Sequence, residues 1–388
     1  MRRRQRRSSG VRPGRAGVVA LAAIAAIAGC AQQAAPPAQA PARQDDAGLV
    51  SGPGTVRWSF RAPAAIAAAG NRVWVADQAA SAVYELNSGT GALIRIISGR
   101  RYRISGPDAI AANRASVWVA NGNNNTVTQL SAASGGLIRV ISAPGDQLNV
   151  PTGLAVAGGR VWVASDGSDL VTELSAATGG LIRVIQGVPY RFETLNGVAA
   201  AGGRVWVPGG GASVTEISAT TGGLIRSLQG PRYQFGTTDP VAVGGGRVWV
   251  GSSAGNPSGR GGNSVTEISA STGALTHVTR SLPSLPMAIA AAGDTAWVAM
   301  NAGAKGSDGG GPHGAVAEIS ARTGALIRVI SSPRYRVGDP QSVAVDGGHV
   351  WVASAGYPGP GGSVTEISAA TGGLIRVVSG GRAQPARR

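Results

Sequence analysis

A tryptophan recurs at nearly constant spacing along most of the chain, and this spacing constrains the fold more than any other feature. Seven of the eight tryptophans stand at intervals of 44, 44, 44, 43, 48 and 54 residues: Trp74, Trp118, Trp162, Trp206, Trp249, Trp297 and Trp351. Internal periods of about 40–50 residues are typical of β-propellers and solenoids, in which one small unit is repeated. We therefore expect one array of seven units, although a length of 388 residues would by itself suggest two or three domains.

Each unit contains four short apolar runs separated by glycine turns, as the third repeat shows. Its runs are residues 153–157, 160–164, 170–174 and 181–185. Runs of this length between glycine turns are typical of β-strands, and none carries a helical period. The pattern predicts an all-β fold over residues 54–380, a seven-bladed β-propeller with four antiparallel strands per blade. A solenoid is the alternative, but its repeats are usually shorter and no capping unit is visible.

The repeats also carry charged residues at a fixed offset. Glu173 and Arg183 are ten residues apart across a Thr-Gly turn, and the same offset recurs in four other repeats, at Glu85 and Arg95, Glu216 and Arg226, Glu318 and Arg328, and Glu366 and Arg376. The remaining two repeats have Gln129 with Arg139 and Glu267 with His277. A fixed offset across a turn predicts opposed residues on a hairpin, which stabilise it by roughly 0.2–1 kcal/mol per pair. We expect these residues, and the repeated tryptophans, to be structural.

The first fifty residues have the composition of an export signal and a spacer. Seven arginines precede an apolar run over residues 17–28, too short for the roughly 20 residues of a membrane-spanning helix. The run ends in Ile27-Ala28-Gly29-Cys30, which resembles a bacterial lipobox, so we expect residues 1–29 to be a lipoprotein signal peptide and Cys30 to be lipidated. A plain secretory signal with a chance cysteine and a twin-arginine signal are the alternatives. Residues 30–53 read as a flexible Ala/Pro/Gln-rich tether and residues 381–388 as a basic tail.

The positions of the charged residues along the chain decide whether the net positive charge indicates a nucleic-acid ligand. The formal charge is +16, and arginine greatly outnumbers lysine, which taken alone suggests a nucleic-acid ligand. Seven of these charges lie in the signal, and the folded region keeps a formal charge near +7. We therefore expect no nucleic-acid partner. The single cysteine excludes a disulfide scaffold and a cysteine-based structural zinc site.

The repeat as a whole resembles a known group of propellers. The segment Val-Trp-Val-Ala, followed by Val-Thr-Glu-Leu-Ser-Ala-Ala-Thr-Gly-Gly-Leu-Ile-Arg-Val-Ile, is similar to YVTN and NHL-type repeats over about residues 54–380. The resemblance implies a seven-bladed propeller with lactonase-like and streptogramin-lyase-like relatives. Quinoprotein propellers carry a similar docking motif, but here Ser175 and Arg183 replace its Asp and Trp. The streptogramin lyases use a metal with His and Glu residues, and no such cluster is found in this sequence.

Candidate binding residues lie in the connections that vary between repeats. The second-to-third connections are longest at 251–263 and 301–314, and the blade-to-blade connections carry aromatic and basic residues: Tyr102, Tyr190, Tyr233, Tyr335, Arg103, Arg191, Arg232 and Arg336. Both connection types should share one face of a propeller, and variable loops on a rigid scaffold commonly bind ligands. The alternative is that each tyrosine fills a gap under its own loop. His313 is the one loop histidine and could equally be an exposed loop residue.

Three aspartates precede the innermost strands and could face the central channel. Asp108, Asp239 and Asp339 together could hold a divalent cation at the channel mouth. The alternative is turn chemistry, because Asp-Pro occurs at two of the three positions. No other cofactor is indicated.

These features favour a monomeric lipoprotein anchored in the bacterial cell envelope, outside the cytoplasm. We expect it to act as a non-catalytic binding or scaffold module that uses its variable loop face to bind a protein, a glycan or a small molecule. The alternative is a metal-assisted lactonase, hydrolase or lyase with its site at the channel mouth.

Overall fold

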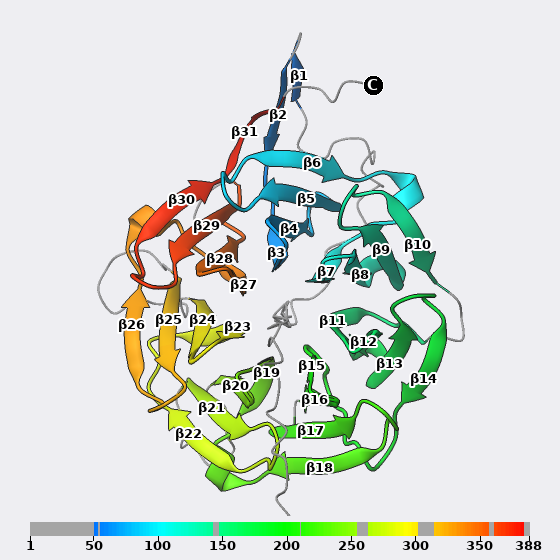
Figure 1. Cartoon of the computed structure of the whole chain (residues 1–388), viewed down its shortest axis with the longest axis vertical. Coiled ribbons are helices and arrows are strands. Elements are labelled where there is room, and N and C mark those ends of the chain that lie inside the picture. Colours follow the sequence, from blue (N-terminus) through cyan, green and yellow to red (C-terminus); the bar gives the residue numbers. More distant parts are fainter. Residues whose placement is uncertain are drawn as a thin grey trace, which may run out of the picture.

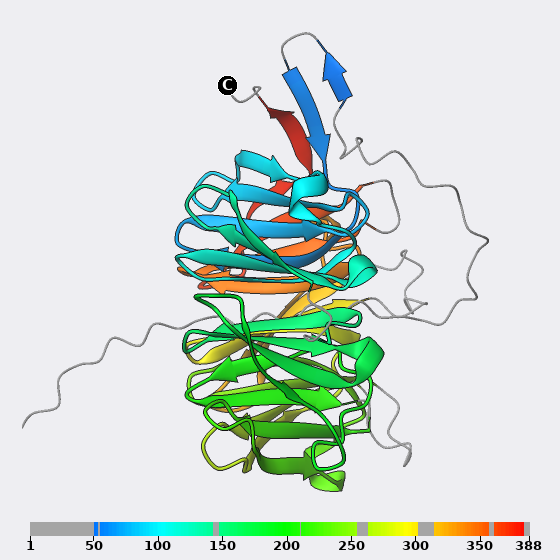
Figure 2. The ribbon, with the colours of Figure 1, turned by 90° about the vertical axis from the view of Figure 1, so that its right-hand side faces the viewer.

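A computed structural model describes residues 50–52, 55–142, 147–209, 211–253, 263–301, 314–356 and 361–383. The chain forms a ring of seven four-stranded antiparallel sheets, arranged like the blades of a propeller around a central axis (Figure 1). The all-β, seven-bladed prediction is confirmed. Figure 2 shows the ring from the side, as a disc one blade thick, with a smaller sheet projecting from its rim.

Each blade is built from consecutive strands, from the axis outward. The innermost strands are β3 (Pro63–Ala69), β7 (Pro107–Ala112), β11 (Pro151–Ala157), β15 (Ala199–Ala201), β19 (Thr237–Gly244), β23 (Leu285–Ala292) and β27 (Pro340–Asp346). The second strands, which carry the tryptophans, are β4 (Arg72–Asp77), β8 (Ser116–Asn121), β12 (Arg160–Ser165), β16 (Arg204–Gly209), β20 (Arg247–Ser253), β24 (Thr295–Asn301) and β28 (His349–Ser354).

The outer half of each blade is a hairpin. The third strands are β5 (Ala82–Asn87), β9 (Thr126–Ser131), β13 (Leu170–Ser175), β17 (Ser213–Ser218), β21 (Ser264–Ser269), β25 (Ala315–Ser320) and β29 (Ser363–Ser368). The outermost are β6 (Leu93–Ile97), β10 (Leu137–Ile141), β14 (Leu181–Ile185), β18 (Leu224–Gln229), β22 (Leu275–Thr279), β26 (Leu326–Ile330) and β30 (Leu374–Val378). Short 3₁₀ turns occur at η1 (Arg100–Tyr102), η2 (Gly122–Asn124), η4 (Asp166–Ser168), η5 (Pro231–Tyr233) and η6 (Pro333–Tyr335). None of the helices in the described part of the chain has the length and hydropathy of a membrane-spanning segment.

One row of four residues crosses each blade. In blade 3 the strand register sets Ala155 opposite Trp162, Trp162 opposite Glu173 and Glu173 opposite Arg183. Directly opposed residues share one face of a sheet, so these four side chains lie in a line. The row recurs in every blade, with Gln129 in place of the glutamate in blade 2 and His277 in place of the outer arginine in blade 5. The predicted glutamate–arginine hairpin register is therefore confirmed.

The row explains the core. The residue opposite the tryptophan is alanine in all seven blades, which leaves room for the indole: Ala67, Ala111, Ala155, Ala199, Ala242, Ala290 and Ala344. The seven repeated tryptophans are at most 2% exposed and are among the largest fully buried side chains. Burying one such side chain removes about 150–250 Å² of surface from water, so these residues dominate the core.

The outer end of the row joins neighbouring blades. The Arg183 guanidinium donates to the carbonyl of Thr220 in the next blade at 3.0 Å, and Arg376 of blade 7 donates to Gly89 of blade 1 at 2.8 Å. The turn glycine beside each arginine is a spatial requirement, because Gly222 has φ +74° and a Cβ there would lie 2.6 Å from the Cδ of Arg183. The repeated Thr-Gly and Leu-Ile-Arg motifs thus form one docking device between blades.

Each outer strand is also bulged. Glu173 pairs with Arg183 while Leu174 pairs with Leu181, so Ile182 is the extra residue of a β-bulge. The same register shift occurs in the other blades, and the bulge residue is exposed, with Ile182 at 41% and Ile327 at 46%. Bulges interrupt a free strand edge and so oppose edge-to-edge association.

The first and last described segments of the chain meet in a separate three-stranded sheet and do not share a blade. Strand β2 (Thr55–Ser59) pairs with β1 (Val50–Gly52) and with β31 (Gly380–Ala383), which follows the complete seventh blade. Residues 55–59 therefore lie outside all seven blades. The terminal sheet includes residues 50–52, which the sequence assigns to the tether, and residues 381–383, which it assigns to the tail.

Aromatic packing attaches the terminal sheet to blade 1. The Trp58 ring packs edge-on against Phe60 with centroids 5.3 Å apart, and Phe60 packs against Tyr84 of β5 at 4.9 Å. The Tyr84 hydroxyl donates to the carbonyl of Ser59 at 3.1 Å. The eighth tryptophan is therefore also a core residue, at the junction where the ring closes.

Candidate functional site

The tyrosines of the blade-to-blade connections are held inside the protein. Tyr102, Tyr233 and Tyr335 are buried and Tyr190 is half-buried. The hydroxyls of Tyr190, Tyr233 and Tyr335 donate to the carbonyls of Gly222, Gly273 and Gly372, the turn glycines of the next blade, at 2.9 to 3.1 Å. These contacts correspond to the expected alternative, in which each tyrosine fills a gap under its own loop.

The carbonyl of each tyrosine is fixed as well. A threonine of the next blade donates its hydroxyl to it, as Thr215 does to Tyr190 at 2.7 Å and Thr266 does to Tyr233 at 2.7 Å. Thr128 and Thr365 bind Tyr102 and Tyr335 in the same way. The threonine of the Val-Thr-Glu motif therefore clamps the preceding connection.

The arginines near these tyrosines divide into two kinds. The arginine before the tyrosine stacks on its ring, with Arg232 4.6 Å from the Tyr233 centroid and Arg334 5.0 Å from that of Tyr335. The residue after the tyrosine is exposed and left-handed, with φ between 50° and 52°, at Arg103, Arg191 and Arg336. These candidate residues lie at separate blade junctions and are not gathered into one site.

The predicted channel aspartates differ in their surroundings. Asp108 is buried in β7 and accepts a hydrogen bond from Gln78 Nε2 at 2.5 Å. Burial raises the pKa of Asp108 to about 6, and the Gln78 hydrogen bond opposes this shift. Burial also raises the pKa of Asp339, whose Oδ1 has no hydrogen-bond partner among the described residues.

The other predicted site residues lie outside what the structure describes. The side chain of Asp239 is not described, and Cys30 and His313 lie outside the described residues. Within the described ranges, no group of three His, Cys, Asp or Glu side chains could hold a metal ion. A cation site at the channel mouth therefore stays a prediction.

The buried glutamates have a second basic partner that the sequence argument missed. Glu173 is fully buried, and Arg160 of β12 contacts its Oε1 while Arg183 Nε lies 2.8 Å from its Oε2. Equivalent residues in other blades, two positions before the tryptophan, are Arg72, Arg204, Arg247 and His349. The repeated Arg-Val-Trp segment carried this signal.

Two blades lack the glutamate held between two basic side chains. In blade 2 Ser116 and Gln129 replace the inner arginine and the glutamate, and they hydrogen-bond to each other at 2.9 Å. In blade 6 Thr295 replaces the arginine, so among the described residues Glu318 pairs with Arg328 alone, and burial raises the pKa of Glu318. The pKa of Glu366 is also raised by burial, against the attraction of Arg376 and His349.

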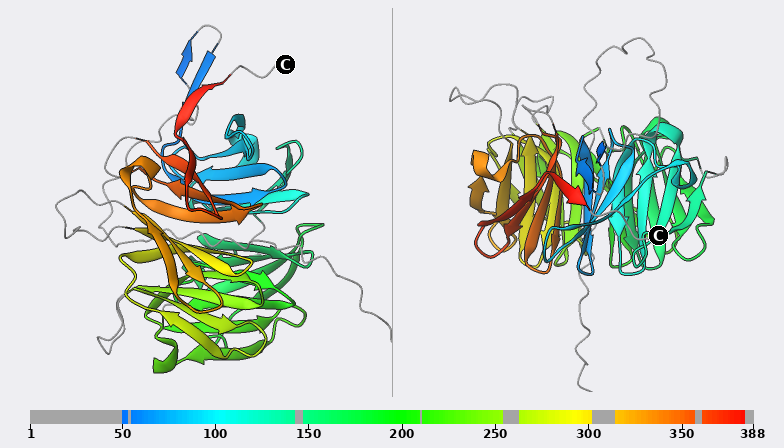
Figure 3. Two further views of the ribbon diagram at one scale, coloured as in Figure 1. Left: turned by 60° about the vertical axis from the view of Figure 1, so that its left-hand side comes forward. Right: turned by 90° about the horizontal axis from the view of Figure 1, so that it is seen from above.

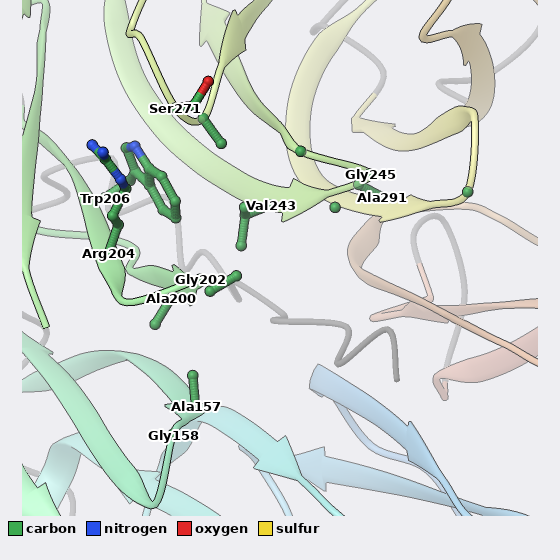
Figure 4. Close-up of a pocket in the computed structure, with 15 residues that line it drawn as sticks. Ala157, Gly158, Ala200, Gly202, Arg204, Trp206, Val243, Gly245, Ser271 and Ala291 are labelled. Carbon is green, nitrogen blue, oxygen red and sulfur yellow. The ribbon is translucent and has the colours of Figure 1, made fainter. Parts of the chain in front are cut away.

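A cavity of about 550 Å³ opens between blades 4 and 5 (Figure 4). It lies on the face of the short turns, beside the axis, and it reaches outward to the third-to-fourth turn of blade 5. Its lining comes from four blades: Ala157, Gly158, Ala200, Ala201, Gly202, Arg204, Trp206, Val243, Gly244, Gly245, Gly246, Ala270, Ser271, Ala291 and Gly293. The innermost strand of blade 4, β15, has only three residues, and it packs less extensively on its neighbours than the other inner strands do.

The cavity has an apolar interior and a polar outer end. Methyl groups of alanine and valine line it near the axis, and Figure 4 shows Arg204 and the Trp206 ring side by side across from Val243. Arg204 contacts the carboxylate of Glu216 through one terminal nitrogen, and its side chain is 29% exposed. A guanidinium has five N–H donors, so the remaining donors and the Ser271 hydroxyl can bind an acceptor group.

The cavity lies on the face of the disc opposite the 3₁₀ turns. Strand connections alternate between the two faces of the disc, with the 3₁₀ turns on one side and the glycine turns on the other (Figure 3). The sequence predicts ligand binding on the face of the long second-to-third connections at 251–263 and 301–314. Residues 254–262 and 302–313 of those loops lie outside the described part, so that expectation remains a prediction.

Comparisons with known proteins support the fold alone. No protein-family model matches the chain, and no curated protein matches it. Among solved structures, the chain is similar to the computationally designed Ika8 protein, with a TM-score of 0.59 and 16% identity over 84% of this chain and 90% of that one. It is also similar to Kuenenia stuttgartiensis hydrazine synthase, with a TM-score of 0.61 and 16% identity over 80% of this chain and 96% of that one. Likeness at this identity defines the class of protein, a seven-bladed β-propeller.

Proposed function

We propose that the chain is an exported, lipid-anchored β-propeller that binds a small molecule in the cavity between blades 4 and 5. The observation that carries this proposal is the cavity itself, whose volume of about 550 Å³ lies within the roughly 300–1,000 Å³ range of small-molecule sites. Its turns are held by backbone hydrogen bonds, from Ala219 N to the carbonyl of Gly203 and from Ala270 N to that of Gly246, both at 2.9 Å, so little ordering cost accompanies binding.

The lining indicates the chemical class of the ligand. An apolar body would displace water from the alanine and valine walls, at about 25 cal/mol for each Å² of apolar surface buried. One acceptor group at the outer end would accept hydrogen bonds from Arg204 and Ser271. A flat aromatic carboxylate such as 2-naphthoate has both features and is a suitable first probe.

A binding role agrees with how the ionisable side chains are used. Six buried glutamates contact arginine or histidine within their own blade: Glu85, Glu173, Glu216, Glu267, Glu318 and Glu366. Three tyrosine hydroxyls donate to turn carbonyls. These groups stabilise the ring, and their repetition in most blades differs from the asymmetry that a single catalytic centre needs. Turnover of lactones or esters that depends on Asp239 would instead support the enzymatic alternative.

A pair of matched substitutions tests the cavity. Ala201→Leu adds three carbons inside it, whereas Ala69→Leu adds the same carbons at the same register position of blade 1. We expect 2-naphthoate to bind the natural chain and the blade 1 variant equally, and to bind the blade 4 variant about tenfold or more weakly in isothermal titration. Equal affinity of all three would exclude this cavity as the site.

The envelope location rests on the sequence and has its own test. If Cys30 carries the lipid, Cys30→Ala should move the chain from the membrane fraction to the soluble fraction. Metabolic labelling with a fatty acid should lose its signal in the same variant. Unchanged membrane retention would contradict lipid anchoring, whatever the outcome of the cavity experiment.

A further inference from the structure

A second cavity lies at the seam where blade 7 meets blade 1. Its volume is about 400 Å³, and its lining is Ser59, Phe60, Arg61, Arg336, Gly361, Gly362 and Ser379. The residues come from the end of β2, the segment after η6, the connection before β29 and the segment between β30 and β31. The cavity is thus formed only when the ring is closed.

Two guanidinium groups line this cavity without a carboxylate partner. Arg61 and Arg336 are both exposed, and neither forms an ion pair within the described ranges. The neighbouring acid, Asp77, is fully buried, and its two oxygens accept backbone N–H groups of Arg61, Ala62 and Ala80 at 2.7 to 3.0 Å. Asp77 therefore fixes the backbone of this segment while the positive charge of Arg61 remains available.

The main chain around both arginines is held in place. The carbonyl of Arg336 accepts a hydrogen bond from the Ser363 hydroxyl at 2.9 Å, and the carbonyl of Phe60 accepts one from Gly362 N at 3.0 Å. Phe60 itself is fully buried. Two cations are therefore presented to one cavity from rigid backbone, the arrangement that favours a bound anion over a transient contact.

We propose that the seam cavity binds a phosphate group, with Arg61 and Arg336 bonding to its oxygens. Arginine presents a planar fork of donors that matches the oxygens of phosphate, and the Ser59 and Ser379 hydroxyls at the wall can donate as well. The phosphate can belong to a free ion or to the headgroup of an anionic phospholipid. The anchor proposed at Cys30 would bring phospholipid headgroups near the cavity, because the terminal sheet begins about twenty residues after Cys30. Binding of a phosphate group in the cavity does not itself require the anchor.

The test compares two double variants of the full chain that lose the same charge. Arg61→Gln with Arg336→Gln removes the cavity guanidiniums, and Arg114→Gln with Arg322→Gln removes two exposed arginines outside the cavity. All chains carry Cys30→Ala, so that no lipid is attached and any binding by the leading segment is common to them. Circular dichroism checks that each variant is folded.

Inorganic phosphate is the first probe, titrated against chloride at equal ionic strength. We expect phosphate to raise the melting temperature of the natural chain and of the control, and its affinity to fall about tenfold or more in the cavity variant. No effect of phosphate on the natural chain, or an equal loss in both variants, would overturn the proposal.

Vesicles of phosphatidylglycerol and of phosphatidylcholine distinguish the sources. An affinity for phosphatidylglycerol vesicles that is lower only in the cavity variant would assign the site to a lipid headgroup. Phosphate binding with equal flotation of both variants would assign it to a free phosphate. Because neither result involves the cavity between blades 4 and 5, failure here is distinguishable from failure of the proposed ligand site.

Discussion

Replacing Arg160 and Glu173 of blade 3 by the serine and glutamine found at the same positions of blade 2 tests how the buried row of each blade is stabilised. In blade 3, Glu173 is fully buried between Arg160 and Arg183. In blade 2 the same two positions are Ser116 and Gln129, which hydrogen-bond to each other, and Gln129 also donates to the carbonyl of Ala176 in the next blade. The changes Arg160→Ser and Glu173→Gln, made singly and together, form a double-mutant cycle with a natural reference in the same molecule.

The magnitudes follow from burial. Removing one partner of a fully buried pair costs about 3–5 kcal/mol, but the Arg160 side chain is 30% exposed and Arg183 remains, so we expect about 1–2 kcal/mol for Arg160→Ser. Glu173→Gln leaves Arg160 and Arg183 without a carboxylate, and we expect a similar loss. The double variant regains a neutral hydrogen bond between serine and glutamine. Its loss of unfolding free energy should therefore be about 1 kcal/mol smaller than the sum of the losses of the two single variants.

The single variant Arg160→Ser should also acquire a pH dependence. It leaves Glu173 in the position of Glu318, whose pKa is raised by burial. A carboxyl whose folded pKa lies above its unfolded pKa loses stabilisation as the pH rises through the folded value. The destabilisation relative to the natural chain should therefore be larger at pH 7 than at pH 4.

Urea denaturation followed by tryptophan fluorescence measures these differences, because a buried tryptophan lies next to the glutamate in each row. Two results would show that the buried row is not stabilised in this way. One is a double variant as unstable as the combined single variants, and the other is an Arg160→Ser variant with no loss at pH 7.

Three further predictions address other parts of the molecule. Asp108→Asn removes a carboxyl whose pKa is raised to about 6, so it should stabilise the folded chain above pH 6 by up to about 3 kcal/mol. At pH 4 it should give no such stabilisation. Melting temperatures that match those of the natural chain at both pH values would contradict this. Gly222→Ala should lower the free energy of unfolding by about 1–2 kcal/mol more than Gly347→Ala does. Both glycines have positive φ, but only an added Cβ at Gly222 would press on Arg183. Equal losses of unfolding free energy in urea would show that the arginine does not constrain that turn. Tyr233→Phe removes the donor to Gly273 and should lower the free energy of unfolding by about 0.5–1.5 kcal/mol; an unchanged free energy of unfolding in urea would show that this hydrogen bond does not stabilise the blade junction.

The repeating part of the fold is predictable because every blade solves the same packing problem. The spacing of Trp162 from its neighbours and the ten-residue offset of Glu173 and Arg183 fix the strands and their register. Arg160 was readable too, since a basic residue stands two positions before most of the tryptophans. Non-repeating features were harder. Strand β31 begins with Gly380 and Gly381, which carry little strand propensity, and it forms only because β2 is there to pair with it.

The two cavities could not be predicted because they depend on contacts between blades. The one between blades 4 and 5 exists where the three-residue strand β15 packs sparsely beside β19, although Ala201 and Gly202 look like their counterparts in other repeats. The environment of Asp108 likewise depends on Gln78 of the preceding blade, a residue in a turn without any repeated motif. Sequence periodicity identifies what the blades share, whereas a site arises where they differ.

A crystal structure of the full chain grown with 2-naphthoate tests the central claim most directly, because it locates the ligand without reference to any variant. We predict density for the naphthyl rings against Ala157, Val243 and Ala291, with the carboxylate toward Arg204 and Ser271. Density on the face of the long loops, or an occupied channel mouth with this cavity unchanged, would contradict the account.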